Sequence, residues 1–376
     1  MNEVRACRRF KIQLKSIRCE EVVVMAVSAV RTLYGADNKA NQGGIRVLHL
    51  LGAGVAYPDV ELTSQFLGEI GPDLDPSSRA LLSRIGVVSR RVSLPLGYIK
   101  ETKNVSAIEG RTVATCSPTA LGVAAVKQAL DRAGILPEQV GLLIADTATP
   151  HQTCPSEAQR IAGSLQLKIP AYDMVGGAGA LPLHLETLNN WKPERVPEFV
   201  VCVSSNTPSQ HVDYADRTAA AHLFGDAASA VVVSTRNAGK MKLVNSYLRR
   251  TSAYRSPFTI DRHLSFSADA MLPATEIVQM VTQGVKRLKE KHDFNSVSAK
   301  LIGPQLFDGQ LVAFADTLGF ESDSIISTSQ HFGYSVGSSI GAALASVWDD
   351  INSGEHVVIV HAGDGLWSGS VMLASE

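Results

Sequence analysis

One order of helices and strands occurs twice along this 376-residue chain, and this repeat limits the possible folds more than any other feature. Apolar runs predict strands over residues 141–145, 171–175 and 199–203 in the first half, and over 300–302, 324–327 and 356–360 in the second. Helical spacing predicts helices over 126–130, 158–165 and 183–188, and over 281–288, 311–318 and 336–348. Two copies of one α/β unit with helical crossovers predict mixed sheets that are covered by helices on both faces.

Local start and stop signals support this order of elements. The apolar run Val47–Val55 reads as a strand that opens the regular part of the chain and ends before a turn. Ser117 is a candidate N-cap, Pro118 fits the first helical position, and Gly134 fits the C-cap of the same helix. We therefore expect this helix to lead directly into the buried strand at 142–145.

Composition excludes several classes of function. With 45% hydrophobic and 19% charged residues, the chain can form sizeable cores, and its formal net charge of -1 gives no electrostatic basis for binding nucleic acid or an anionic membrane. We expect no membrane span and a cytoplasmic location. Five cysteines without a CxxC pair predict neither a zinc site nor a disulfide framework: Cys7, Cys19, Cys116, Cys154 and Cys202.

Residues 1–45 differ in character from the rest of the chain. They combine a basic start with a short apolar run and a polar stretch, whereas a regular pattern begins at Arg46. We predict an N-terminal extension and leave three alternatives open: a mobile tail, a partner-binding arm, or a misassigned start with Met25 as the true first residue. The two halves of the repeat are then expected at 46–235 and 236–376.

Three segments together resemble the ketoacyl synthase III family. Residues 224–230 read FGDAASA, similar to the family's FGDGAGA signature; residues 85–91 are similar to its TGIRERR segment; and residues 363–370 are similar to its closing glycine-rich hairpin. The resemblance covers residues 46–376 with few gaps. It implies a thiolase-type α/β fold in which two pseudo-repeated halves form a five-layered αβαβα core, and a dimer whose sheets join across a two-fold interface.

The resemblance also locates the expected nucleophile. The family places a cysteine on a strand-to-helix turn, where the helix N-terminus lowers the thiol pKa and backbone N–H groups form an oxyanion hole. The equivalent turn here is Tyr172–Ala180, and counting from Asp173 puts Ala178 at the cysteine position. A methyl group cannot form a thioester.

Two further catalytic positions of the family are changed as well. Gln305, which follows Pro304, stands where the resemblance implies a histidine, and glutamine cannot act as an acid or base near neutral pH. Tyr334, which follows Gly333, stands where it implies an asparagine. The resemblance therefore predicts a fold without Claisen condensation and without decarboxylation.

Substrate-binding positions are partly retained. The family's adenine-stacking tryptophan corresponds to Ala80, whereas Arg84 and Arg217 match positions that meet the phosphate of CoA or of a carrier protein. The alternative is that both are ordinary surface arginines. We expect no tightly bound cofactor and no metal, and an acyl thioester of CoA or acyl carrier protein as the ligand.

Further residues of the sequence are candidates for catalysis or for ligand binding. Cys154 lies where the family's loop reaches the partner subunit's acyl pocket, so it is either a substitute nucleophile near His151 or a small interface residue. A dinucleotide site at Gly177 is disfavoured because the third glycine of its motif falls at Pro182. We interpret Asp226 and three histidines as structural: His184, His331 and His361.

These observations predict a non-catalytic ketoacyl synthase III-like subunit in fatty-acid, polyketide or other secondary metabolism. It would act as a homodimer or, with a catalytically intact homologue, as a heterodimer, and it would meet acyl carrier protein. Two alternatives remain: an autonomous acyltransferase or thioester-processing enzyme with a remodelled site, and a module that binds an acyl thioester without turnover.

Overall fold

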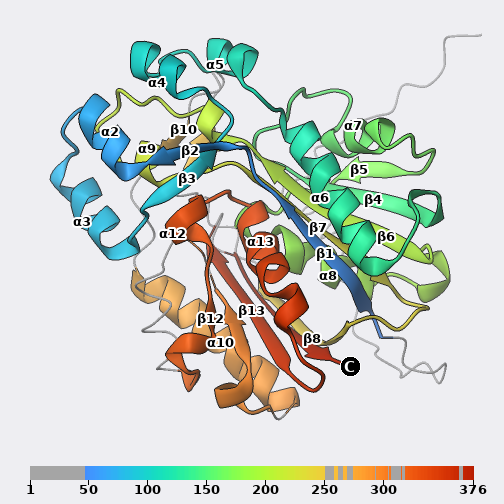
Figure 1. Ribbon diagram of the computed structural model, residues 1–376. Coiled ribbons are helices and arrows are strands. Elements are labelled where there is room, and N and C mark those ends of the chain that lie inside the picture. The colour runs from blue at the N-terminus through green and yellow to red at the C-terminus, as the bar shows by residue number, and fades with distance from the viewer. Residues whose placement is uncertain are drawn as a thin grey trace, which may run out of the picture. The chain divides into compact units, whose positions relative to one another are not determined.

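A computed structural model describes residues 47–249, 258–260, 266–268, 274–292, 294–303, 305, 315, 318–363 and 367–376 (Figure 1). The expected extension at 1–45 and most of the expected helix at 311–318 lie outside the described residues. The boundary expected at residues 235 and 236 falls between two strands of the large sheet.

Five strands of the first half lie side by side in one order. They are β5 (Ala171–Asp173), β4 (Val140–Asp146), β6 (Phe199–Asn206), β7 (Ala227–Ser234) and β1 (His49–Ala56). The first three are parallel, and β7 and β1 each run antiparallel to the preceding neighbour. The apolar runs expected at 141–145, 171–175 and 199–203 are therefore the three parallel strands of this group.

Five strands of the second half repeat that order. They are β12 (Ile325–Ile326), β11 (Lys300–Ile302), β13 (His356–Gly363), β14 (Trp367–Ser375) and β8 (Met241–Arg249). Again the first three are parallel and the last two antiparallel. Two residue pairs between β1 and β8 join both groups into one ten-stranded sheet. The internal repeat predicted from the sequence is confirmed.

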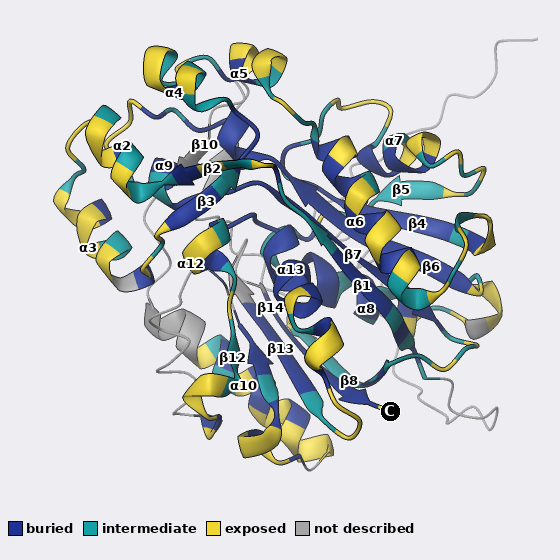
Figure 2. Ribbon diagram, in the orientation of Figure 1, coloured by how far each residue is buried: buried dark blue, intermediate teal, exposed yellow. Residues whose placement is uncertain are grey.

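Helices cover both groups of strands in alternating layers. α6 (Pro118–Ala133) and α7 (Glu157–Ser164) pack on the outer face of the first group, and α10 (Ala274–Lys291) packs on the outer face of the second. α8 (Ala180–Asn189) and α13 (Ser338–Ser346) contact strands of both groups. Figure 2 shows the buried strands and the exposed outer faces of α6 and α10. This is the αβαβα arrangement that the resemblance implied.

The period of two along the strands explains the layers. Ala228, Ala230 and Val232 of β7 join the core cluster beneath α6, whereas Val231 and Val233 join the cluster that contains α8 and α13. A Cβ atom at Gly54 of β1 would overlap the backbone of α6, so this glycine permits the close contact. Ser117 accepts a hydrogen bond from the backbone of Ala120 and Gly134 has φ 65°, which confirms both predicted caps.

Two small antiparallel sheets and several short helices complete the described part of the chain. The sheets pair β2 (Val60–Thr63) with β3 (Ser89–Val92) and β9 (Phe258–Ile260) with β10 (Phe266–Ala268). The α-helices are α2 (Ser64–Ile70), α3 (Pro76–Ile85), α4 (Leu96–Thr102), α5 (Ala107–Val113), α9 (Ala220–Leu223) and α12 (Ser329–Phe332). The 3-10 helices are η1 (Pro137–Gln139), η2 (Gly177–Gly179), η3 (Pro193–Arg195), η4 (Pro208–Gln210), η5 (Ser296–Ser298), η6 (Ser322–Ser324) and η7 (Trp348–Asp350).

Several predicted boundaries were wrong by a few residues. β5 ends at Asp173, two residues early. The Met174 N–H makes a last ladder bond to the Ala145 carbonyl, and the N–H groups of Gly176 and Gly177 then donate to the side chain of Asp146 instead of to a strand. The helix expected from residue 336 begins at Ser338, because Val336 has a positive φ of 50° that an α-helix cannot contain.

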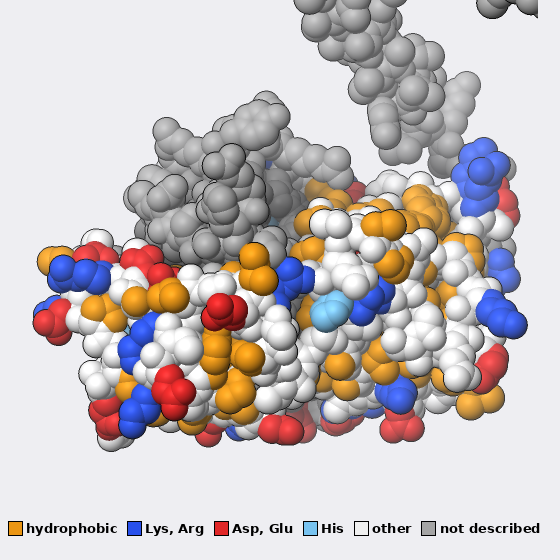
Figure 3. All heavy atoms as spheres, turned by 90° about the horizontal axis from the view of Figure 1, so that it is seen from above, with side chains coloured by type: hydrophobic (Ala, Val, Ile, Leu, Met, Phe, Trp, Pro, Cys, Tyr) orange, Lys and Arg blue, Asp and Glu red, His pale blue; other side chains and the backbone are white. Residues whose placement is uncertain are grey.

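The face of the molecule seen in Figure 3 has a mixed distribution of side chains over its described part. Where Figure 3 shows described atoms, small groups of hydrophobic side chains alternate with charges of both signs. No helix in the described ranges is long and apolar enough to cross a membrane. Cys116, Cys154 and Cys202, the described cysteines, form no disulfide.

Candidate active site

The turn that carries Ala178 lies between β5 and α8. Within this turn, residues Gly177–Gly179 form the 3-10 helix η2. Gly177 has φ 53°, a conformation that favours glycine. Ala178 packs against the core cluster that also contains Tyr334. Asp173, the residue from which the turn was located, caps α7 by accepting hydrogen bonds from the N–H groups of Glu157 and Ala158. The turn is therefore where the sequence pattern predicted it.

A buried carboxylate, Asp146, lies against this turn. Its Oδ1 accepts hydrogen bonds from the N–H of Gly176 at 2.7 Å and of Gly177 at 3.1 Å, and its Oδ2 accepts one from the Ser204 hydroxyl at 2.7 Å. Burial raises the pKa of Asp146 to about 6, opposed by the hydrogen bonds of these groups and of Asn206. The last residue of β4 thus holds the turn that precedes position 178.

The polar cluster around Asp146 continues toward the second half. Asn206 Nδ2 donates to Ser204 Oγ at 3.3 Å and to Ser338 Oγ at 3.2 Å, and Ser338 Oγ donates to the Ser204 carbonyl at 3.0 Å. A Cβ atom at Gly337 would overlap the carboxylate of Asp146. The end of β4, the end of β6 and the start of α13 therefore meet at one point.

Backbone strain marks the same place. Val336 is buried and has φ 50°, although β-branched side chains are disfavoured in the left-handed region. Such strain costs on the order of 1–3 kcal/mol and persists only where the surrounding structure imposes it. Here the imposed shape brings the backbone of Gly337 against Asp146, between Tyr334 and α13.

Gln305 is held entirely by backbone groups. Its Nε2 donates to the carbonyls of Gly303 and Ile326, at 3.1 and 3.2 Å, and its Oε1 accepts from the N–H of Thr328 at 2.8 Å. The side chain is 1% exposed. Both amide hydrogens are thus committed to the carbonyls of the residue after β11 and of the last residue of β12, and Pro304 lies outside the described residues.

Tyr334 is part of the hydrophobic core. It is buried, its ring centroid lies 5.8 Å from that of Phe224, and its backbone pairs with Leu223 and Gly225. It therefore joins α12 to the segment that contains the FGDAASA signature. The structure brings Ala178 and Tyr334 into contact with one hydrophobic cluster, and Gln305 is hydrogen-bonded to the backbone of Gly303, Ile326 and Thr328.

Two buried histidines lie on elements that pack against the turn. His184 of α8 pairs through Nε2 with the Met174 carbonyl at 2.9 Å, and burial lowers its pKa to about 4. Burial lowers the pKa of His361 on β13 to about 3. His184 and Ser204 help to line a cavity of about 10 Å³, which holds at most one water molecule. Both histidines are neutral at pH 7, as expected of structural residues.

The two candidate phosphate-binding arginines are only partly described. Arg217 is exposed, and its Nε donates to the Asp73 carbonyl at 2.8 Å, just before α3. Arg84 is a residue of α3, but its side chain lies outside the described part. Ala80 is an exposed residue of the same helix. These positions therefore gather at α3.

Cys154 lies on an exposed loop between β4 and α7. Glu157, which is fully buried, fixes this loop by accepting hydrogen bonds from the N–H of His151 and the hydroxyl of Thr119. His151 has its pKa lowered by burial first and by Arg160 second. Cys154 itself is exposed, and the described contacts include no hydrogen bond between it and His151.

A second buried carboxylate, Asp226, belongs to the FGDAASA segment. It accepts hydrogen bonds from the N–H and the hydroxyl of both Ser93 and Ser209, at 2.5–2.8 Å. Burial raises its pKa to about 6. Because its partners tie β7 to the segment after β3 and to η4, this is the arrangement expected of a structural carboxylate.

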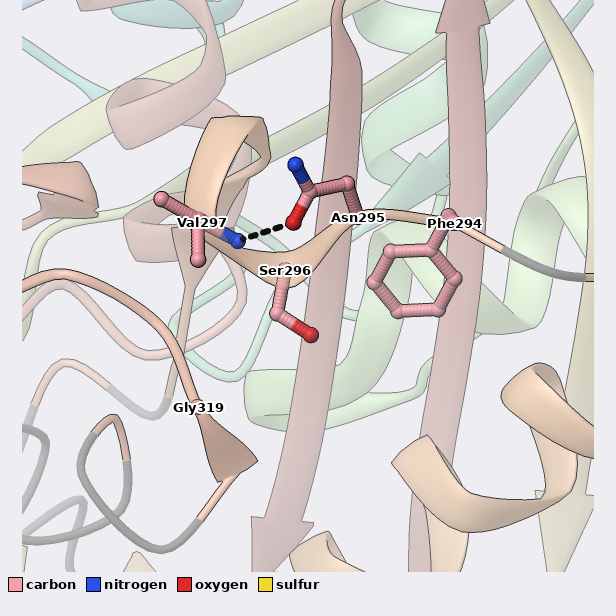
Figure 4. A pocket seen from close by; sticks show the side chains of 5 residues that line it. All are labelled: Phe294, Asn295, Ser296, Val297 and Gly319. Carbon is pink, nitrogen blue, oxygen red and sulfur yellow. Dashed lines mark hydrogen bonds between the residues drawn. The ribbon is translucent and has the colours of Figure 1, made fainter.

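One depression on the surface does not involve these residues. Its volume is about 430 Å³, and Figure 4 shows it lined by Phe294, Asn295, Ser296, Val297 and Gly319. Asn295 Oδ1 is already bonded to the Val297 N–H at 3.1 Å. No residue of the three sequence motifs contributes to it, so it carries no functional assignment.

Sequence reasoning missed Asp146, Gly337 and the strain at Val336. The sequence does contain a signal for Asp146, because it is a carboxylate at the carboxyl end of a buried parallel strand. Ligand sites of α/β folds lie at that edge of the sheet. Gly337 and Val336 carry none, because their roles depend on contacts with β4, almost two hundred residues away.

Comparison with known proteins agrees with this geometry. Residues 173–252 match the family described as 3-Oxoacyl-[acyl-carrier-protein (ACP)] synthase III. The chain is 27% identical over 337 residues to a beta-ketoacyl-[acyl-carrier-protein] synthase III of Rhizobium meliloti (strain 1021), covering 86% of this chain and 97% of the relative. It is 24% identical over 330 residues to that of Aquifex aeolicus (strain VF5), covering 86% and 98%.

Solved structures show the same fold. The 3-oxoacyl-(acyl carrier protein) synthase III of Pseudomonas aeruginosa PAO1 superposes with a TM-score of 0.73 at 25% identity, covering 88% of this chain and 98% of the other. A tetronic acid condensing enzyme superposes with a TM-score of 0.69 at 18% identity, covering 87% and 100%. The expected thiolase-type fold is confirmed.

Proposed function

We propose that this chain, which is similar to ketoacyl synthase III proteins, is a non-condensing subunit of an acyltransferase or ketosynthase complex in fatty-acid, polyketide or secondary-metabolite biosynthesis. The observation that carries the proposal is the methyl group of Ala178 in the turn between β5 and α8, at the position that the resemblance assigns to the nucleophile. Without a nucleophile, neither acyl transfer to the protein nor condensation can begin there.

The other two positions support the same conclusion. Both amide hydrogens of Gln305 are committed to backbone carbonyls, so this residue has no donor left for a thioester carbonyl. The ring of Tyr334 packs into the core against Phe224. Neither side chain replaces the histidine and asparagine that the family's chemistry needs.

The subunit would act through a dimer with a catalytically intact homologue. β5 is an outer strand of the sheet, and Val175 just beyond it is 62% exposed, a large apolar exposure for a residue beside a turn. The Cys154 loop leads into α7, which packs on β5. A partner joined along β5 would therefore meet this loop, which would shape the partner's acyl pocket.

Acyl uptake tests the proposal. The purified chain is incubated with acyl-CoA and acyl-carrier-protein thioesters, and its mass is measured intact. We expect no covalent adduct and no condensation product from the chain alone. An acyl adduct on the native chain would overturn the proposal.

Assembly is tested with a matched pair of variants. Val175→Glu places a charge beside β5, whereas Val297→Glu places one on a valine of similar exposure, 57%, elsewhere on the surface. Only the first should abolish co-purification with a co-expressed homologue that has the cysteine, histidine and asparagine. Equal co-purification of both variants would contradict an interface at β5.

An autonomous thioester-processing enzyme is the second candidate, favoured by the exposure of Cys154. It predicts turnover by the chain alone that drops sharply in Cys154→Ala. The acyl-thioester binding module predicts saturable binding of an acyl-CoA, weakened in Arg217→Ala, with no product.

A further inference from the structure

Asp146 places a carboxylate directly against the backbone of the turn at residues 176–178. Oδ1 accepts from two consecutive N–H groups, and the second belongs to Gly177, the residue before Ala178. The side chain is completely buried and lies in contact range of the Gly337 backbone on the opposite side. Position 178 therefore stands next to an ionisable group that water cannot reach.

The described groups around this carboxylate are uncharged near neutral pH. Its hydrogen-bond partners are two backbone N–H groups, the Ser204 hydroxyl and the Asn206 amide. The ionisable side chains on the helix and strand packed against η2 are His184 and Glu186 of α8 and His356 and His361 of β13. Burial holds His184 and His361 neutral, and Glu186 accepts a hydrogen bond from the Ser246 hydroxyl of β8. α13 contributes no ionisable residue.

A reacting group at this turn would have to become an anion. A cysteine acts as a nucleophile only as the thiolate, and carbonyl addition builds an oxyanion beside it. A second negative charge a few ångströms from an ionised carboxylate, in a buried and weakly screened place, is strongly disfavoured. The turn would thus resist such chemistry even with a cysteine in place of Ala178.

We propose that Asp146 is a positioning residue whose carboxylate holds the turn at 176–178 and whose charge excludes a second anion from it, so that the site is disabled twice. The inference rests on the proposed function in taking position 178 as the place of the lost nucleophile. It adds that restoring the cysteine alone does not restore a reactive thiol.

The test introduces the thiol with and without the carboxylate. Ala178→Cys, Ala178→Cys/Asp146→Asn and Ala178→Cys/Asp226→Asn are alkylated with iodoacetamide from pH 6 to 10, and the labelling rate of each thiol is followed by peptide mass spectrometry. Exposed Cys154 is the reference thiol in every sample. Asp226→Asn is the matched control, because Asp226 is equally buried and also bonded by serines, but on other segments.

We expect the introduced thiol of Ala178→Cys to titrate above Cys154. Asp146→Asn should lower its midpoint by about one to two pH units, which raises the labelling rate at pH 7.5 about ten- to hundred-fold. Asp226→Asn should leave the midpoint unchanged. Equal midpoints with Asp146 and with Asn at position 146 would overturn the proposal, and so would an equal shift in the Asp226→Asn control.

Folding and the proposed function are checked separately. Thermal unfolding of each variant shows whether the turn is intact, and Asp146→Ser, which keeps an acceptor without a charge, replaces Asp146→Asn if the latter does not fold. Acyl uptake by the native chain is measured in parallel. Uptake there would sink the proposed function, whereas a pH midpoint that ignores Asp146 would sink only this inference.

Discussion

Two buried carboxylates of this protein look alike and differ in what surrounds them. Asp146 and Asp226 are both fully buried, both are bonded by serine hydroxyls, and burial raises both pKa values to about 6. Asp226 ties loops together within the first half, whereas Asp146 touches the turn at 178 and the second half at Gly337. A raised pKa alone therefore does not identify a functional carboxylate. The residues that the carboxylate contacts distinguish Asp146 from Asp226.

The two carboxylates also differ in which of their oxygens accept hydrogen bonds from backbone N–H groups. Each oxygen of Asp226 accepts from a backbone N–H, that of Ser93 or that of Ser209. At Asp146, by contrast, Oδ1 takes both N–H groups and Oδ2 faces a hydroxyl, which can reverse its role. An asparagine thus fits at position 146 but not at 226.

The glycines beside the two carboxylates should give the largest effects. Gly337→Ala would clash with Asp146, and Gly225→Ala with the Phe332 carbonyl, so each should lower the free energy of unfolding by about 2–4 kcal/mol in chemical denaturation. Gly163→Ala is the control, since space is open there and helix propensity should raise stability by about 0.5–1 kcal/mol. Asp146→Ser should partly rescue Gly337→Ala but not Gly225→Ala; additive effects in both pairs would contradict the contact.

The pH dependence of stability should reveal Asp146 next. Its folded pKa of about 6 lies above the ordinary aspartate pKa of 3.8, so the folded protein binds this proton more tightly. The free energy of unfolding should therefore fall as pH rises from about 4 to 6, by at most about 3 kcal/mol from this group. Asp146→Asn should flatten that fall in urea titrations at pH 4.5, 5.5 and 7. An unchanged slope would show that Asp146 does not titrate there.

Asparagine substitution at pH 7 separates the two sites directly. Asp226→Asn sets an NH₂ group against a backbone N–H and should lower the free energy of unfolding by about 1–3 kcal/mol. Asp146→Asn keeps both N–H bonds on Oδ1, removes a buried charge, and should be neutral or stabilising. Thermal unfolding of the two variants checks the ordering, and a reversed order would mean that the hydrogen-bond pattern does not govern stability.

Serine removal should have the smallest effects. Ser204→Ala leaves Asp146 with two backbone donors and the Asn206 amide, and it removes one of the acceptors of Asn206. We expect it to lower the free energy of unfolding by about 1 kcal/mol and to raise the Asp146 pKa further. Ser209→Ala leaves Asp226 with three donors and should cost less. Denaturation at pH 5 and pH 8 should show a pH-dependent loss for both variants, because each serine hydroxyl lowers the pKa of its carboxylate. A pH-independent loss for Ser204→Ala would sink the link to Asp146.

The sequence by itself determined the architecture. Apolar runs with a period of two, caps such as Ser117 and Gly134, and the repeated order of elements act locally, so they were readable without coordinates. The position of Ala178 also followed from sequence, because Asp173 and the glycines fix a short turn. The helix at 311–318 and the segment at 1–45 remain predictions, since they lie outside the described residues.

Only the tertiary structure decided what the site contains. Gln305 reads as a possible donor in sequence, but the fold commits its amide to Gly303 and Ile326. From the sequence, Asp146 is only the end of a predicted strand. In the folded protein its carboxylate contacts Gly177 and Gly337, which are 31 and 191 positions away in the sequence. Hydrogen bonding, burial and charge depend on neighbours in space, and the chain brings those neighbours together only when both halves of the repeat have folded.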